Sequence, residues 1–137
     1  MKAILVSGLL GGLVFFLLGG LFYGFLLADF FSEHMPEGME IIAKDPVMPL
    51  ILLGDLFLGL FFAYVFDTWT RIHNFSEGAW MGLALALGFS IHYTFIYSGT
   101  THLVETASAI VDISLSGLSG ALGGGVVGHL LGKMTKT

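Results

Sequence analysis

Four long apolar segments constrain this chain more than any other feature of its sequence. Short polar stretches separate them, and each is long enough to cross a bilayer as a helix, which takes about 20 mostly apolar residues. Helices are the expected form, because an open sheet leaves backbone groups unpaired in lipid. The segments are Ala3–Ala28, Val47–Thr70, Gly78–Tyr97 and Val104–Leu131. The sequence therefore predicts an all-α integral membrane protein with a single transmembrane domain over residues 1–137.

The composition excludes several classes of protein. Charged residues make up 11% of the chain, against about 25% in a soluble domain. The formal net charge of −5 gives no basic surface for nucleic acid. The absence of cysteine excludes thiolate metal sites and iron–sulfur clusters. Because no phosphate-binding loop or hydrolase motif is present either, we expect no enzymatic activity, no cofactor and no catalytic residues.

The basic residues predict the orientation. Lys2, Arg71, Lys133 and Lys136 fall at the N-terminus, in the second loop and at the C-terminus, which share one side of a four-span protein. Only Lys44 falls on the other side. Since cytoplasmic loops are enriched in Lys and Arg, both termini are expected in the cytoplasm, with the chain in a bacterial inner membrane.

The loops favour a four-helix up-down bundle. Most are tight, and short connections place consecutive helices antiparallel. The exception is the acidic first loop, which runs from Asp29 to Pro46 and is expected on the outer side. Pro36 is a candidate start for a short helix in this loop, with apolar residues turned toward the bilayer surface.

Small residues recur at intervals of four in two of the spans. This spacing lets helix backbones approach closely, which drives packing where lipid removes the usual hydrophobic force. The ladders are expected to pack the chain on itself. Alternatively, the ladder of the fourth span forms an interface with another subunit. The glycines concerned are Gly78 and Gly82 in the third span, and Gly120, Gly124, Gly128 and Gly132 in the fourth.

Three ionisable residues lie inside apolar spans, at similar predicted depth. A rise of about 1.5 Å per residue places Asp55 and Asp112 about 12 Å, and His92 about 8–10 Å, below the outer helix ends. Tyr93 and Glu105 lie at or above this level. An Asp at the centre of a membrane helix costs about 2.5–3.5 kcal/mol on insertion. Such a group is therefore expected to face a partner or a cavity.

This predicted layer of two carboxylates and an imidazole fits three roles. It suits a hydrogen-bonded network that fixes helix register, a path for protons or other cations, or a set of metal ligands. A looser group in the outer loops has the chemistry of a soft-metal site, without the spacing of any metal motif. Its members are His34, Met35, Met39, His102 and Glu105.

The inner end of the second span carries a further polar pair. Asp67 and Arg71 are four residues apart, a spacing that places them on one helix face. Tyr64 and Trp69 lie beside them at the depth of an interfacial aromatic belt. We interpret this group as structural.

Two runs of sequence resemble a known group of proteins. The first is Phe16-Leu17-Leu18-Gly19-Gly20-Leu21-Phe22-Tyr23-Gly24; the second is Ala63-Tyr64-Val65-Phe66, followed by Gly78 and Gly82. Both are similar to runs in bacterial four-helix membrane proteins of unknown function, whose first helix ends in an aromatic–tyrosine pair. The resemblance implies a four-helix membrane fold and no catalytic residues.

Two functions are compatible with these observations. The first is a membrane protein without enzymatic activity, which acts as a homo-oligomer or as an accessory subunit of a larger membrane complex. The second is a proton- or cation-coupled transporter or channel that uses Asp55, His92 and Asp112.

Overall fold

The computed structural model describes residues 1–34, 46–101 and 105–135, and the described part is helical with no strand. Helix α1 (Lys2–Gly19) continues as a π-helical segment, η1 (Gly20–Leu26), and the short α2 (Ala28–Glu33) follows. Helix α3 (Met48–Val65) likewise continues as π-helical η2 (Phe66–Thr70). Helices α4 (Phe75–Thr100) and α5 (Thr106–Thr135) complete the chain.

Four helical stretches are long and apolar enough to cross a membrane: Lys2–Leu26, Met48–Thr70, Phe75–Thr100 and Thr106–Thr135. The prediction of four long apolar helices is confirmed. The last two helices extend three to four residues beyond the predicted ends, because polar residues that lower the hydropathy still continue a helix. The helix predicted to start at Pro36 lies outside the described residues.

Local signals in the sequence explain where these helices begin and end. Asn74 caps α4, and its side-chain oxygen accepts a hydrogen bond of 2.9 Å from the backbone N–H of Glu77. Pro49 lies in the first turn of α3, where its missing N–H costs nothing. Arg71 ends η2 in a left-handed conformation, with φ of 52°. The chain can then turn into α4 within four residues.

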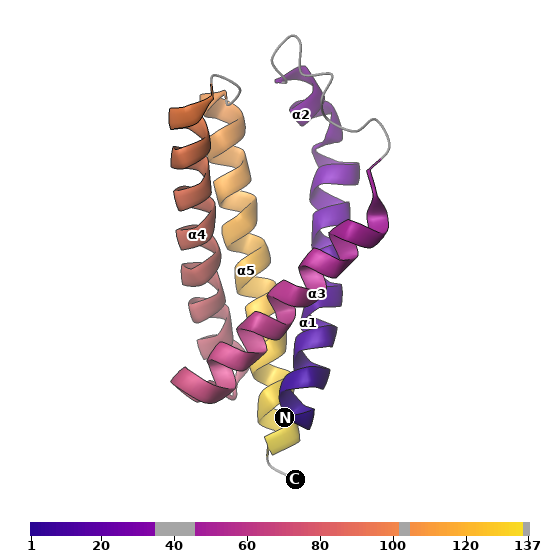
Figure 1. The fold of residues 1–137 in the computed structure, drawn as a ribbon, viewed down its shortest axis with the longest axis vertical. Coiled ribbons are helices and arrows are strands. Elements are labelled where there is room, and N and C mark those ends of the chain that lie inside the picture. Colours follow the sequence, from indigo (N-terminus) through magenta and orange to yellow (C-terminus); the bar gives the residue numbers. More distant parts are fainter. Residues whose placement is uncertain (35–45, 102–104, 136–137) are drawn as a thin grey trace.

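The helices associate in two pairs (Figure 1). Helix α4 lies along α5, α1 crosses α3 obliquely, and α1 joins the pairs through its contact with α5. Both chain termini lie at one end of the molecule, where the pairs converge, and the pairs diverge toward the end that carries α2 (Figure 1). We call these two parts the terminal half and the α2 half.

Glycines bring α4 and α5 into backbone contact. A Cβ atom on Gly82 would lie 2.9 Å from the Cα of Gly124, and one on Gly124 would lie 2.8 Å from the Cα of Gly82. Gly78 meets Gly124 and Gly128 in the same way, and Gly120 meets Gly82. The fourth-span ladder is therefore covered by α4 and, at Gly132, by His73 in the turn before α4 of the same chain. An interface with another subunit would have to use a different face.

A second set of glycines sets the crossing of α1 and α3. A Cβ on Gly12 would lie 2.5 Å from the Cα of Leu56, and one on Gly8 would lie 2.7 Å from the Cα of Leu60. From the other helix, a Cβ on Gly59 would lie 2.7 Å from the Cα of Gly12. Three glycines at the crossing thus let the two backbones touch, which maximises van der Waals contact without large side chains.

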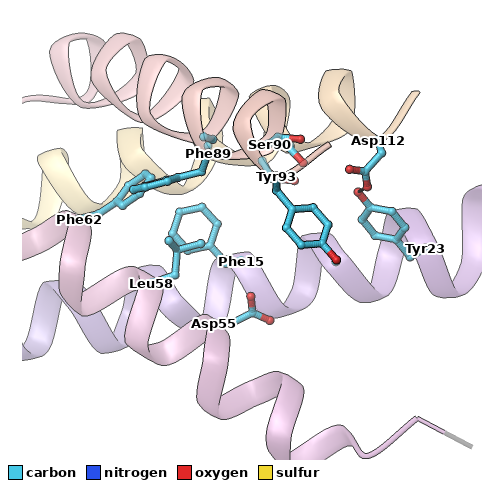
Figure 2. Close-up of a pocket in the computed structure, with 14 residues that line it drawn as sticks. Phe15, Tyr23, Asp55, Leu58, Phe62, Phe89, Ser90, Tyr93 and Asp112 are labelled. Carbon is cyan, nitrogen blue, oxygen red and sulfur yellow. Dashed lines mark hydrogen bonds between the residues drawn. The ribbon is translucent and has the colours of Figure 1, made fainter. Parts of the chain in front are cut away.

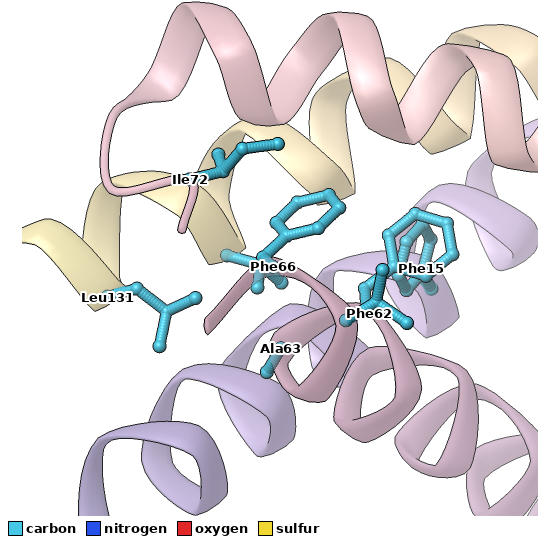
Figure 3. Close-up of a cluster of buried hydrophobic side chains, with 8 residues drawn as sticks. Phe15, Phe62, Ala63, Phe66, Ile72 and Leu131 are labelled. Atoms are coloured by element: carbon cyan, nitrogen blue, oxygen red, sulfur yellow. The ribbon is translucent and has the colours of Figure 1, made fainter. Parts of the chain in front are cut away.

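The apolar core fills the terminal half (Figure 3). Its centre consists of Phe62, Phe66, Val127 and Leu131, none of which has accessible surface. Phe15 of α1 meets Phe62 edge to face, with ring centroids 5.2 Å apart. Around them lie Ala63, Val65 and Ile72. This core contains side chains of α1, α3 and α5, of η2 (Phe66) and of the turn between η2 and α4 (Ile72).

The α2 half is packed differently. Six glycines in it have no neighbour within 4 Å of an added Cβ: Gly19, Gly20, Gly24, Gly54, Gly88 and Gly99. Most of the described glycines that meet another helix lie in the terminal half or near the middle of their helix, whereas Gly117, which meets Leu83 and Leu87, lies nearer the α2 end of α5. Glycine thus brings helices into contact over most of the molecule, whereas these six glycines of the α2 half contact no other described helix.

A matched pair of substitutions on α4 tests this division. We expect Gly82→Ala to destabilise the protein by about 1–3 kcal/mol, since its Cβ meets backbone that cannot move aside. Gly88→Ala meets nothing and should be neutral or stabilising by up to about 1 kcal/mol, the helix preference of alanine over glycine. Reversible unfolding in mixed micelles, followed by circular dichroism, measures both. Equal effects of the two substitutions would contradict the packing described for α4 and α5.

Candidate functional site

A cavity of about 350 Å³ lies between the diverging helix pairs, and all four apolar spans line it (Figure 2). Aromatic and aliphatic side chains form most of its wall. The polar side chains in the wall are Tyr23, Asp55, Ser90, Tyr93, Asp112, Ser116 and Ser119. No Lys, Arg or His belongs to the described wall, so its two ionisable acids face no basic group there.

Asp112 is held by a tyrosine from the other helix pair. The hydroxyl of Tyr23, in η1, donates a hydrogen bond of 2.6 Å to Oδ1 of Asp112 on α5. The ring of Tyr23 also stacks on Phe31 of α2, with centroids 5.2 Å apart. Tyr23 therefore connects α2, η1 and α5 where the two helix pairs diverge.

Asp55 has no comparable partner. Its carboxylate lies on the α3 side of the cavity (Figure 2). Within the described residues it accepts no hydrogen bond and forms no ion pair. A carboxylate inside a membrane span is costly unless it is paired or solvated. Asp55 is thus the group in the wall that most requires a ligand or water.

The floor of the cavity is the top of the apolar core. Phe15 and Phe62, in edge-to-face contact, close it toward the terminal half, and Leu58 lies beside them (Figure 2). Phe89 and Tyr93 of α4 form the facing wall. Because the core below is closely packed, contents of this cavity can exchange only through the α2 half or between the helices.

Two buried serine hydroxyls lack hydrogen-bond partners among the described residues. They are the Oγ atoms of Ser90 and Ser108. Ser90 belongs to the cavity wall. Since most buried polar side-chain atoms in proteins are hydrogen-bonded to protein or ordered water, an oxygen of this kind next to a cavity indicates a position for a bound polar group.

The cavity contains part of the polar layer expected from the sequence. Asp55, Asp112 and Tyr93 lie around it, but His92 is exposed and does not belong to the wall. Ala86, Phe89, Ser90 and Tyr93 recur at the spacing of one helix face. His92 is turned about 100° from Tyr93 by the helical period.

Two further differences concern Glu105 and Tyr23. Glu105 is exposed, precedes α5 and does not line the cavity. Tyr23 lies outside the predicted polar layer, although its hydroxyl donates a hydrogen bond to Asp112. A hydroxyl-bearing aromatic residue within an apolar span is the signal that points to such a role.

Of the looser soft-metal group, the structure describes only His34 and Glu105. Met35, Met39 and His102 lie outside the described residues, and His34 stacks on Phe30 with centroids 4.2 Å apart. Nowhere in residues 1–34, 46–101 and 105–135 do three or more His, Asp or Glu side chains gather as a metal site would require.

The polar pair at the C-terminal end of the second span differs from the predicted pairing of Asp67 with Arg71. Asp67 Oδ1 lies 3.1 Å from Nε2 of His73, rather than beside Arg71. The chain turns at Arg71 in a left-handed conformation, and this turn brings His73 back to Asp67 of η2. Tyr64 and Trp69 lie beside each other there, with ring centroids 6.1 Å apart.

Comparisons with protein-family models, with curated protein sequences and with solved structures find no match for this chain.

A double-mutant cycle tests the bond between Tyr23 and Asp112. We expect Tyr23→Phe to lower the free energy of unfolding by about 0.5–1.5 kcal/mol, the size of one hydrogen bond in a membrane protein. Tyr93→Phe is the control, because the Tyr93 hydroxyl makes no hydrogen bond to the described residues. The effect of Tyr23→Phe should disappear when Asp112 is replaced by alanine. An undiminished effect in the Asp112→Ala background would exclude this bond as the cause.

Proposed function

We propose that this chain is a membrane protein without enzymatic activity that binds a proton or another cation as part of a pathway through the bilayer. The observation that supports this best is that Asp55 and Asp112, from different helices, line one cavity with no basic residue in its wall. Ionisable residues within membrane spans commonly mark ion or proton pathways.

The chemistry of the cavity favours binding of positive charge. Two carboxylates, two tyrosine hydroxyls and three serine hydroxyls line it. A carboxylate in a low-dielectric surrounding either takes up a proton or attracts a cation, because an isolated negative charge there is unfavourable. Asp55, without a hydrogen bond from the described residues, is the primary acceptor in this proposal, and Asp112 with Tyr23 is the secondary one.

The distribution of basic residues supports an orientation in which the cavity opens toward the outer side. Lys2, Arg71 and Lys133 all lie at the converging end of the helices. With Lys and Arg retained in the cytoplasm, we place both termini there, in the inner membrane of a bacterium, as an up-down bundle. The apolar core then separates the cavity from the cytoplasm, so transport would require the core to rearrange.

Flux measurements in liposomes test the pathway. We expect Asp55→Asn and Asp112→Asn each to reduce proton or sodium flux by about tenfold or more, which corresponds to at least about 1.4 kcal/mol. Glu77→Gln is the matched control, because Glu77 is exposed at the start of α4 and away from the cavity. Wild-type flux in both Asn variants, with protein correctly inserted, would refute the proposed pathway.

Association with other chains is a second candidate function, and one observation favours it. A groove of about 350 Å³ runs between η1 and the start of α3, and its wall includes Gly19, Gly20 and Gly24. These glycines meet no described residue of their own chain. Small residues on a lipid-facing surface permit close approach of another helix. The chain would then act as a homo-oligomer or within a larger membrane complex.

Subunit exchange between differently labelled copies tests this candidate. If a helix of a second copy occupies the groove, Gly24→Leu should weaken association by about tenfold, because a leucine prevents contact between the backbones. Gly88→Leu, at an equally open glycine of α4, should leave association unchanged. Energy transfer in bilayers at decreasing protein-to-lipid ratio measures the effect. A chain that remains monomeric at every ratio and copurifies with no protein is incompatible with both forms of this candidate.

A further inference from the structure

We infer that the cavity between Asp55 and Asp112 binds an organic cation, namely a compact ammonium group that carries an apolar or aromatic body. This inference rests on the proposed cation-binding function and specifies the class of cation. Three features of the cavity support it independently: its charge, its walls and its volume.

The acidic side chains of the wall favour a ligand with positive charge. Asp112 already accepts a hydrogen bond of 2.6 Å from the hydroxyl of Tyr23. Asp55 has no partner among the described residues, and the described wall contains no basic side chain. A ligand with one positive charge near Asp55 would therefore pair with the carboxylate that has no other partner among the described residues.

The walls favour an organic cation over an inorganic one. A divalent metal ion such as calcium takes six to eight oxygen ligands, and no metal-like group of acidic and histidine side chains occurs in the described chain. The cavity instead presents aromatic rings, from Phe15, Phe89 and Tyr93. Ring faces attract ammonium groups, and most strongly when water is excluded. An apolar body fits these walls, and its charged end fits the carboxylate.

The volume of the cavity limits the size of this ligand, and one buried hydroxyl offers it a hydrogen bond. About 350 Å³ is at the lower end of the range for small-molecule sites. This suits a ligand with a single ring and a small ammonium group. The Oγ of Ser90, which has no partner in the described part of the chain, lies in the same wall. It provides a hydrogen-bonding position for a ligand that also carries a hydroxyl or a carbonyl.

Direct binding to the full chain in lipid nanodiscs tests the inference. The probe is benzyltrimethylammonium, and the control ligand is neopentylbenzene, which has the same shape without the charge. We expect saturable binding of the cation at one site per chain, measured by equilibrium dialysis. The uncharged isostere should bind at least about tenfold more weakly, because it cannot pair with a buried carboxylate.

Three variants separate the contributions to binding. Asp55→Asn should weaken binding of benzyltrimethylammonium by about tenfold or more. Phe89→Leu, which keeps an apolar side chain but removes the ring, should weaken it by about two- to fivefold, the size of one cation–π contact. Glu77→Gln should leave it unchanged. Circular dichroism and gel filtration of each variant show whether it folds.

The outcomes separate this inference from the proposed function. If benzyltrimethylammonium does not bind, or binds the folded Asp55→Asn variant as tightly as the wild type, the inference is overturned. In that case, an Asp55-dependent flux of protons or sodium still supports the pathway. If the cation binds as expected but no flux depends on Asp55, the inference holds and the pathway fails.

Discussion

Contact between helix backbones is the constraint on which the rest of this structure depends. At two places, glycines remove every side-chain atom between neighbouring helices: where α4 meets α5 at Gly82 and Gly124, and where α1 crosses α3 at Gly12 and Gly59. In lipid, apolar side chains gain little by leaving one apolar surrounding for another, so close van der Waals contact must supply the association. These two contacts form the α4–α5 pair and the α1–α3 pair. The aromatic core and the contact between α1 and α5 then join the two pairs in the terminal half.

The cavity is a consequence of that one-sided packing. Helix pairs that converge at one end and cross obliquely must separate at the other, and polar groups from all four spans line the space between them (Figures 1 and 2). Tyr23 is the side chain that bridges the space by a hydrogen bond, from η1 to Asp112 on α5. Tyr23 also contacts α2, because its ring stacks on Phe31. A ligand that competed for Asp112 would therefore act on α2, η1 and α5 together.

Much of the fold follows from the sequence, whereas less of the site does. Long apolar runs predict four helices, because hydropathy and helix length are local properties. The depth argument also brings Asp55 and Asp112 to the same cavity, since a rise per residue needs no knowledge of neighbours. Depth does not give rotation about the helix axis, however. His92 is at a suitable level but is exposed, while Tyr93, one residue later, lines the cavity. Asp67 similarly meets His73 because of a left-handed turn at Arg71.

The sequence by itself determined that this chain forms four apolar helices, that acidic residues lie within them and that small residues recur along their faces. Each of these is a property of one segment and its composition. Only the tertiary structure decided which glycines pack and which stay open, which residues of α4 face Asp55, and that Tyr23 holds Asp112. These depend on how helices cross and rotate against one another, and many combinations of crossing and rotation satisfy the same apolar pattern in lipid.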